Sequence, residues 1–335
     1  MKLALSLLWL CSTLPLAAQD KAGVEVLGQW VGGQWPLEGK MLDTEFSKAA
    51  TLKGVSKCAW SPEHIFVVCD EIVYANGKPE RNLGVYSFDP KAATYHYAEL
   101  MPSGRRPEVS ELIISGDGKR WEYRDRAEIR GQKVLFHTIN EHRGTDAIEW
   151  WNEYSRDDGQ HWTRTGGGTE KREPSTSSAT EKSQADVLAR WIGGKWVGDA
   201  RFLDTEYSKA SAGGGITKCD WSPDHAFVVC DQDVKDNGKA MRFLSVYSFD
   251  PGSSTYHFVG LSPEGDRPRT GDVSITENGG HWEYLTKTTI KDKSVWFRTT
   301  NQFKSNEQVD WWSEYSTDEG QHWTKTGGGS EKRAK

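Results

Sequence analysis

The sequence has little that would indicate a membrane, nucleic-acid or metal-binding protein. Its 335 residues include only 5 Cys, 4 Met and 9 His. The formal net charge is −6, from 42 Lys+Arg against 48 Asp+Glu, so composition gives no basic footprint for nucleic acid. The mostly apolar run from Leu3 to Leu10 is too short to span a membrane. At roughly 150 residues per domain, a globular chain of about two domains is expected.

Familiar catalytic motifs are also missing. The chain contains no G-x-S-x-G, H-E-x-x-H, P-loop or G-x-G-x-x-G pattern. Metal ligation would need Cys or His pairs at suitable spacing, and these are not found. We therefore predict no catalytic residue, no metal site and no bound cofactor, and the sequence favours a protein that is not an enzyme.

The first residues resemble a targeting segment rather than part of a fold. Lys2 precedes the apolar run, and the small residues Ala17 and Ala18 follow it. This order is typical of a secretory signal peptide, so residues 1–18 are predicted to be removed. Cys11 could indicate a lipoprotein, but Leu10 stands where that signal needs a small residue. The predicted location is secreted or periplasmic.

Tryptophan, by contrast, is abundant, and a repeat explains most of it. The chain has 16 Trp, and Trp30 and Trp191 open the same phrase, W-[VI]-G-G-x-W. An offset of 161 residues relates the two copies without a gap from Leu27 to Arg172. We predict domain 1 at residues 24–172, a flexible linker at 173–186 and domain 2 at 187–333. The linker allows the two domains to pack on each other.

Within each copy, turn signals recur about every 13 to 15 residues. Asn76-Gly77 and Asp117-Gly118 tolerate the positive φ of tight hairpins, and β-branched and aromatic runs lie between such turns. A long meander must close to hide its edge strands. The prediction is an all-β fold of two tandem antiparallel up-and-down β-barrels. Each barrel has about ten strands, a short N-terminal helix and an interior large enough for a small ligand.

A β-propeller is the main rival fold. Ser155-x-Asp157-x-Gly159-x-x-Trp162 matches the Asp-box of propeller blades, and it recurs from Ser316 to Trp323. A propeller would show such a motif in each blade, at a spacing of about 40–50 residues. One full match per 161 residues instead favours a hairpin staple in a barrel.

Four cysteines follow the predicted leader, as one pair in each copy. Cys58 and Cys69 flank a Ser-Pro turn, and Cys219 and Cys230 repeat the arrangement. Folding the hairpin about this turn brings each pair close to cross-strand register. Export makes oxidation favourable, so we predict two structural disulfides, Cys58–Cys69 and Cys219–Cys230.

Candidate cavity residues come from aromatic and histidine positions shared by both copies. Strand alternation puts Trp and Tyr of each Trp-Glu-Tyr phrase on one face, without saying which face is interior. The mid-strand histidines of the Thr-Tyr-His phrases are the histidines most suited to face a cavity. Ordinary core packing and ordinary strand hydrogen bonding are the alternatives. The candidate ligand-binding residues are His96, Trp121, Tyr123, His257, Trp282 and Tyr284.

Several phrases resemble known barrel families. Gly33-Gln-Trp35 and Gly194-Lys-Trp196 resemble the opening of calycin barrels, which include lipocalins and nitrobindin-type heme-binding-like barrels. Longer phrases, such as Cys-x-Trp-Ser-Pro-x-His-x-Phe-Val-Val-Cys, resemble an uncharacterised bacterial family of lipocalin-like barrel domains. The resemblance implies the fold and no settled activity. The resemblance does not identify which histidine, among His96, His161 and their partners in the second copy, would correspond to the proximal histidine of the heme-binding relatives, and heme is kept as a minor alternative.

The leading functional hypothesis is a non-enzymatic exported protein that binds a small hydrophobic or aromatic ligand in one or both barrels. A second hypothesis is a hydrolase or isomerase that acts inside the barrel through His96 or Glu153. A third is a scaffold module with filled barrels and exposed Trp. The first requires hollow barrels, the second requires the named groups to converge on one cavity, and the third requires a dry interior.

Overall fold

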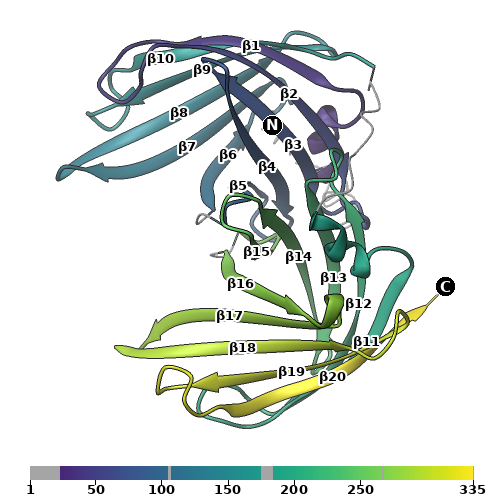
Figure 1. The fold of residues 1–335 in the computed structure, drawn as a ribbon. Coiled ribbons are helices and arrows are strands. Elements are labelled where there is room, and N and C mark those ends of the chain that lie inside the picture. The colour runs from purple at the N-terminus through teal and green to yellow at the C-terminus, as the bar shows by residue number, and fades with distance from the viewer. Residues whose placement is uncertain (1–22, 105–106, 175–183, 266–267, 335) are drawn as a thin grey trace, which may run out of the picture.

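The computed structural model describes residues 23–104, 107–174, 184–265 and 268–334 (Figure 1). The predicted signal peptide and most of the predicted linker lie outside these residues. The described chain forms two closed antiparallel barrels of ten strands each. The predicted fold is therefore confirmed, and the propeller is not found.

The first barrel follows residues 23–27, which are α-helical, and η1 (Gly28–Trp30). Its ten strands run in sequence order around the barrel, and β1 closes the ring against β10. The strands are β1 (Trp35–Met41), β2 (Ala50–Trp60), β3 (Val67–Ala75), β4 (Lys78–Asp89), β5 (Thr94–Leu100), β6 (Glu108–Ile114), β7 (Arg120–Ile129), β8 (Gln132–His142), β9 (Ala147–Ser155) and β10 (Thr163–Lys171).

The second barrel repeats this order after η2 (Gln184–Trp191), and β11 closes it against β20. A short η3 (Glu277–Gly279) lies between β16 and β17. The strands are β11 (Lys195–Phe202), β12 (Ser211–Trp221), β13 (Phe227–Asp236), β14 (Lys239–Asp250), β15 (Thr255–Leu261), β16 (Arg269–Thr276), β17 (His281–Ile290), β18 (Lys293–Phe303), β19 (Gln308–Ser316) and β20 (Thr324–Ala334).

Local turn chemistry explains why the chain reverses where it does. Asn76 and Gly77, between β3 and β4, have φ values of 51° and 82°. This left-handed pair is the geometry of a two-residue hairpin turn. In the Asp-box, the Ser155 hydroxyl accepts a hydrogen bond from the Gly159 N–H at 2.9 Å and donates one to Asp157 at 2.8 Å. The motif is thus a hairpin staple between β9 and β10.

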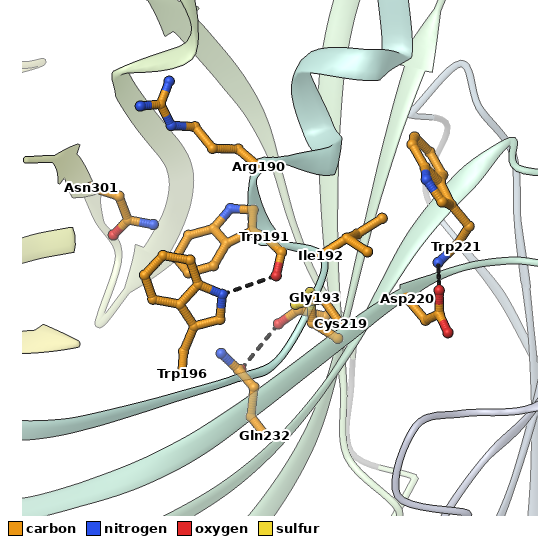
Figure 2. The surroundings of a disulfide bond; sticks show 12 residues. Arg190, Trp191, Ile192, Gly193, Trp196, Cys219, Asp220, Trp221, Gln232 and Asn301 are labelled. Carbon is orange, nitrogen blue, oxygen red and sulfur yellow. Dashed lines mark hydrogen bonds between the residues drawn. A yellow bond between two sulfur atoms is a disulfide. The ribbon is translucent and has the colours of Figure 1, made fainter. Parts of the chain in front are cut away.

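A tryptophan cluster packs against the helical segment in the core of each barrel. In the first barrel the Trp35 indole N–H donates to the Trp30 carbonyl at 2.9 Å, and the Arg172 guanidinium lies 4.5 Å from the Trp35 ring. Figure 2 shows the same arrangement in the second barrel, where the Trp196 indole N–H donates to the Trp191 carbonyl. These tryptophans therefore belong to the hydrophobic core of each barrel.

The two barrels pack on each other through the outer faces of three strands each, β3–β5 and β13–β15, which meet at the centre of Figure 1. A single apolar cluster spans the contact and is built from matching positions of the two copies. In the first barrel it contains Phe66, Val68, Leu83, Val85, Ala98 and Leu100, and the residues 161 positions later complete it.

Two buried aspartates, one on each barrel, accept hydrogen bonds across this contact. Asp70 of β3 accepts the backbone N–H of Asp224 at 2.8 Å, and Asp231 of β13 accepts the N–H of Glu63 at 2.6 Å. Asp224 and Glu63 belong to the Ser-Pro turns of the opposite barrels. Each carboxylate therefore accepts a backbone hydrogen bond across the contact between the barrels.

The disulfides of both hairpins are present and lie in direct cross-strand register. Cys58 pairs with Cys69 between β2 and β3, and Cys219 pairs with Cys230 between β12 and β13. The predicted bridges are confirmed.

Replacing Cys58 and Cys69 together by Ser should lower the free energy of unfolding by about 2–3 kcal/mol, because the short loop they close regains its entropy in the unfolded chain. Urea denaturation of the oxidised protein measures the loss, and the Cys219→Ser/Cys230→Ser variant is the matched comparison. Unchanged midpoints in both variants would contradict a stabilising role.

Replacing Asp70 by Ala should cost about 1–3 kcal/mol, because the Asp224 N–H loses its acceptor in a buried contact. Denaturant unfolding of Asp70→Ala measures the effect. Asp43→Ala is the control, because Asp43 forms only an exposed ion pair with Lys48 at 3.2 Å. Equal stabilities of the two variants would show that the hydrogen bond between Asp70 and the Asp224 N–H adds nothing to the stability of the apolar contact.

Candidate ligand-binding site inside the first barrel

The interior of the first barrel contains a cavity of about 290 Å³. Alternation along each strand builds its wall: on β7, for example, Tyr123 and Asp125 line the cavity while Glu122 and Arg124 lie on the outer face. Trp121, from the same inner row, is fully buried, and its indole N–H donates to the Gly118 carbonyl at 2.9 Å.

Aromatic rings form one part of the cavity wall. The ring centroids of Tyr86 and Tyr97 are 4.9 Å apart, and those of Tyr97 and Tyr123 are 5.1 Å apart. The Tyr86 and Tyr123 hydroxyls are 3.3 Å apart, and the Asn140 amide donates to the Tyr123 oxygen at 3.4 Å. Burial raises the pKa of all three phenols, so they remain neutral. Trp30 and Trp150 complete the aromatic wall.

Carboxyl groups form the other part of the wall. They come from five different strands, and none of the described residues that line the cavity is Lys, Arg or His. On β5 and β6, Glu99 and Glu108 stand directly opposite each other in the ladder. The Asn82 amide donates to Glu99 at 2.9 Å. The cavity carboxyl groups are Glu71, Glu99, Glu108, Asp125 and Glu170.

Burial and nearby acidic groups disfavour the charged forms of three of these groups, Glu71, Asp125 and Glu170. Burial, and next the Glu99 charge, raise the pKa of Glu71 to about 7. Burial, and next Glu71, raise the pKa of Glu170 well above its usual value. Burial also raises the pKa of Asp125. Glu170 is only 6% exposed, and its Oε2 atom has no hydrogen-bond partner among the described residues. The cavity is thus acidic and incompletely satisfied.

The structure places the sequence-predicted residues on two different faces. Tyr123 lines the cavity, Trp121 belongs to the core beside it, and Trp282 and Tyr284 occupy the corresponding core of the second barrel. Their role in ligand binding stays a prediction.

His96 and His257 do not line the interior, which corrects the expected orientation of both side chains. On β5, Tyr97 and Glu99 face the cavity, so alternation turns His96 outward to the contact between the barrels. A Cβ atom on Gly265 would lie 2.4 Å from the His96 Nδ1 atom, and one on Gly104 would lie 2.2 Å from the His257 Nδ1 atom. Each histidine therefore packs on a glycine of the opposite barrel.

Glu153 also lies on the outer face. Its Oε1 atom is 3.2 Å from Nδ1 of His137, whose Nε2 atom is 3.3 Å from Glu122. Arg298 replaces His137 in the second barrel and contacts Glu314 at 2.8 Å. His137–Glu153 and Arg298–Glu314 join equivalent strands of the two barrels, so this cluster is a cross-strand polar contact on the outer face. The enzyme hypothesis requires His96 and Glu153 to converge on the cavity, and these two side chains lie outside it.

Sequence reasoning missed the cavity carboxyl groups because its candidate residues came from aromatic and histidine positions that the two copies share. Four of the five have no acidic counterpart: Gln232, Gly260, Arg269 and Thr286 stand at the positions of Glu71, Glu99, Glu108 and Asp125. Only Glu170 is matched, by Glu331. The signal was present in the sequence as a difference between the copies. Figure 2 shows Gln232 on the strand beside Cys219 in the second barrel.

Neither a cluster of metal-ligating residues nor a membrane-spanning helix is found among the described residues. No group of three or more His, Cys, Asp or Glu among these residues is arranged to hold a metal ion. No described helix has the length and apolar character needed to cross a bilayer. His96 and His161, which were considered for heme, are both outside the cavity lining.

Comparisons with known proteins assign no family. No family model and no curated protein matches the chain. Among solved structures, a protein of unknown function of the DUF3598 family from Nostoc punctiforme is similar, with 11% identity and a TM-score of 0.30, over 93% of this chain and 99% of that one. Rv2717c from Mycobacterium tuberculosis is similar with 13% identity and a TM-score of 0.33, over 45% and 97%. At these TM-scores the similarities establish neither ancestry nor function, and the lipocalin-like resemblance stays a prediction.

Replacing Glu71 by Gln should stabilise the protein at pH 8 and change little at pH 4.5. The unfolded chain loses the Glu71 proton near pH 4.5, whereas the folded protein keeps it to about pH 7. Stability contributed by the protonated group is therefore lost as the pH rises through this window. Gln cannot ionise, so its advantage should reach up to about 3 kcal/mol at pH 8.

Denaturant unfolding at the two pH values measures this difference. Glu38→Gln, at the exposed surface, is the control, since Glu38 makes only an exposed contact of 3.8 Å with Lys53. Gln at position 71 suits the fold, because the second barrel carries Gln232 there. If Glu71→Gln changes the free energy of unfolding by the same amount at both pH values, the titration argument is contradicted.

Proposed function

We propose that this protein is an exported binding protein whose first barrel holds a small organic ligand in its interior cavity. The observation that carries the proposal is the cavity of about 290 Å³ with a buried carboxyl oxygen, Glu170 Oε2, that lacks a hydrogen-bond partner among the described residues. An unpartnered buried polar atom costs free energy, and a bound ligand that supplies a donor recovers it. Ligand cavities typically combine such polar groups with an aromatic wall.

The two disulfides support the exported location. Cross-strand bridges in both hairpins are typical of proteins that fold in an oxidising compartment. The expected leader at residues 1–18 agrees with this and lies outside the described residues. The sequence led us to expect a hydrophobic or aromatic ligand. The residues that line the cavity favour a ligand with two parts: an aromatic part that packs on the tyrosines and a polar part that binds the carboxyl groups.

Filling the cavity provides a direct test. Thr138 of β8 lines the cavity, and Thr299 is its counterpart in the second barrel. Phe is well tolerated in strands, so Thr138→Phe should fold while occupying the ligand space. Native mass spectrometry of the protein purified from its own host should show a small-molecule adduct on the wild type and on Thr299→Phe. Thr138→Phe should lose at least tenfold in adduct occupancy.

Both variants are compared at equal protein concentration, and circular dichroism confirms that each retains its strands. An adduct that survives in Thr138→Phe and disappears in Thr299→Phe would move the site to the second barrel. A wild-type protein that carries no small-molecule adduct would overturn the proposal.

A further inference from the structure

We infer that the face through which the two barrels pack is self-complementary, so that this face, once freed, binds the same face of a second copy of the chain. We call it the docking face. In each barrel it consists of the outward side chains of three consecutive strands, β3–β5 or β13–β15, and the turns beside them (Figure 1). The inference concerns the outer wall of the barrels and does not depend on a ligand in the cavity. Reciprocal pairs of contacts across the face carry the argument.

The apolar part of the docking face uses the same positions in both barrels. Leu83 of β4 and Leu244 of β14 are fully buried in the shared cluster, and five of its six pairs of positions hold identical residues. The sixth pair is Ala98 and Val259. An isologous contact uses one patch twice, so matching patches are what it requires. Exchanging either face for its counterpart therefore preserves the apolar contact, apart from the size of one side chain.

The hydrogen bonds across the contact are reciprocal as well. The Ser87 hydroxyl donates to the Pro263 carbonyl at 3.4 Å, and the Ser248 hydroxyl donates to the Pro102 carbonyl at 3.3 Å. These two bonds are related by the 161-residue offset, and so are the two aspartate bonds described above. Each of the four joins a side chain to a backbone group. Because both copies present these groups, a barrel paired with its own copy would make the same set of bonds.

The charges across the contact are complementary in the same manner. Lys57 contacts Asp224 at 2.7 Å. Its counterpart Lys218 contacts Glu63, which stands at the position of Asp224. Two first barrels joined through this face would place Lys57 against Glu63, and two second barrels would place Lys218 against Asp224. Neither pairing brings like charges together at these positions, and like charges are one way in which a protein excludes a wrong partner.

The shape of the contact is also reciprocal. His96 packs on Gly265, and His257 packs on Gly104. The φ values of Gly104 and Gly265 are 65° and 71°, a left-handed conformation that favours glycine. Each turn therefore presents backbone without a side chain where the opposing imidazole ring lies. Pairing two first barrels would seat His96 on Gly104, which offers the same room as Gly265.

An exposed ion pair and the covalent linkage favour pairing within one chain. Lys91 lies 3.2 Å from Glu264, and the equivalent positions hold Gly252 and Ser103. An exposed pair of this kind contributes little. Linkage contributes more, because it keeps the two faces of one chain at a high effective concentration. The faces therefore occupy each other, and an isologous contact closes at two copies, so the intact chain should be a monomer.

The test frees one docking face in the full chain. Leu244 and Val246 are 0% and 1% exposed, so Leu244→Glu/Val246→Glu puts two carboxylates into the apolar contact and prevents pairing through the second barrel. The first barrel's face is then free. Size-exclusion chromatography with light scattering should give this variant twice the mass of the wild-type monomer. The reciprocal Leu83→Glu/Val85→Glu variant should double in mass as well, and the variant with all four substitutions should be a monomer.

Cleavage between the barrels shows which faces are joined. A protease recognition sequence inserted between Ser177 and Ser178, in the predicted linker, allows the folded protein to be cut. Each barrel has its own closed sheet, core cluster and disulfide, so both should survive the cut. The cut wild type should remain a pair of unlike barrels. The cut Leu244→Glu/Val246→Glu variant should yield a first-barrel dimer and a second-barrel monomer.

Val197→Glu/Ile216→Glu is the matched control. It adds two charges to the second barrel at positions that are 42% and 39% exposed, on β11 and β12, and it should behave as the wild type does. Circular dichroism confirms that every variant retains its strands. If the cut Leu244→Glu/Val246→Glu variant gives two monomers, the docking face does not recognise itself and the inference is overturned. A cut variant that remains a pair of unlike barrels overturns it as well, because the contact then does not depend on this face.

A second measurement needs no substitution in the docking face. The cut wild type is diluted into urea below its unfolding transition until the barrels separate, and it is then returned to buffer and concentrated. Native mass spectrometry distinguishes the three possible pairs by mass. We expect pairs of two first barrels and pairs of two second barrels beside the unlike pair. The recovery of unlike pairs alone would overturn the inference and leave the proposed ligand, which is measured on the intact chain, untouched.

Discussion

Closure of each ten-strand meander is the constraint on which the rest of the structure depends. Hydrogen bonding of β1 to β10, and of β11 to β20, leaves neither barrel with an edge strand. Alternation then directs every second side chain into one enclosed interior. Glu170, paired with Leu37 across the first seam, faces that interior and is kept from bulk water. The acidity of the cavity is thus a consequence of where closure places these strands.

Alternation also gives neighbouring residues opposite environments. On β3, Asp70 points outward and accepts a backbone N–H from the other barrel, while Glu71 points into the cavity. Burial raises the pKa of both carboxyl groups. The outward carboxylate has a fixed donor in the folded chain, and the inward one faces other acids. Two adjacent acids therefore serve different purposes, one in joining the barrels and one in shaping the cavity.

The sequence predicted the features that depend on local chemistry. The Asn-Gly turns, the 161-residue offset and the spacing of Cys58 and Cys69 led to two ten-strand barrels with one bridge each. It did not predict which face of a strand is interior, because that depends on packing between distant segments. His96 faces outward because Tyr97 occupies the inner row and Gly265 of the other barrel leaves room for an imidazole ring. No pattern local to Thr-Tyr-His contains that information.

The duplication separates residues that the fold needs from residues that are particular to one barrel. Residues that make the fold recur in both copies, as the six matched pairs of the apolar contact show. A search for shared residues therefore finds tryptophans, turns and bridges, which are structural. The cavity acids differ between copies, and a strand position such as Glu108, whose counterpart is Arg269, resembles ordinary surface variation until closure shows that it lines a cavity. Since the second barrel folds without these acids and their burial together is unfavourable, their presence in the first barrel requires a reason other than stability. The small organic ligand that we propose for this cavity would supply that reason.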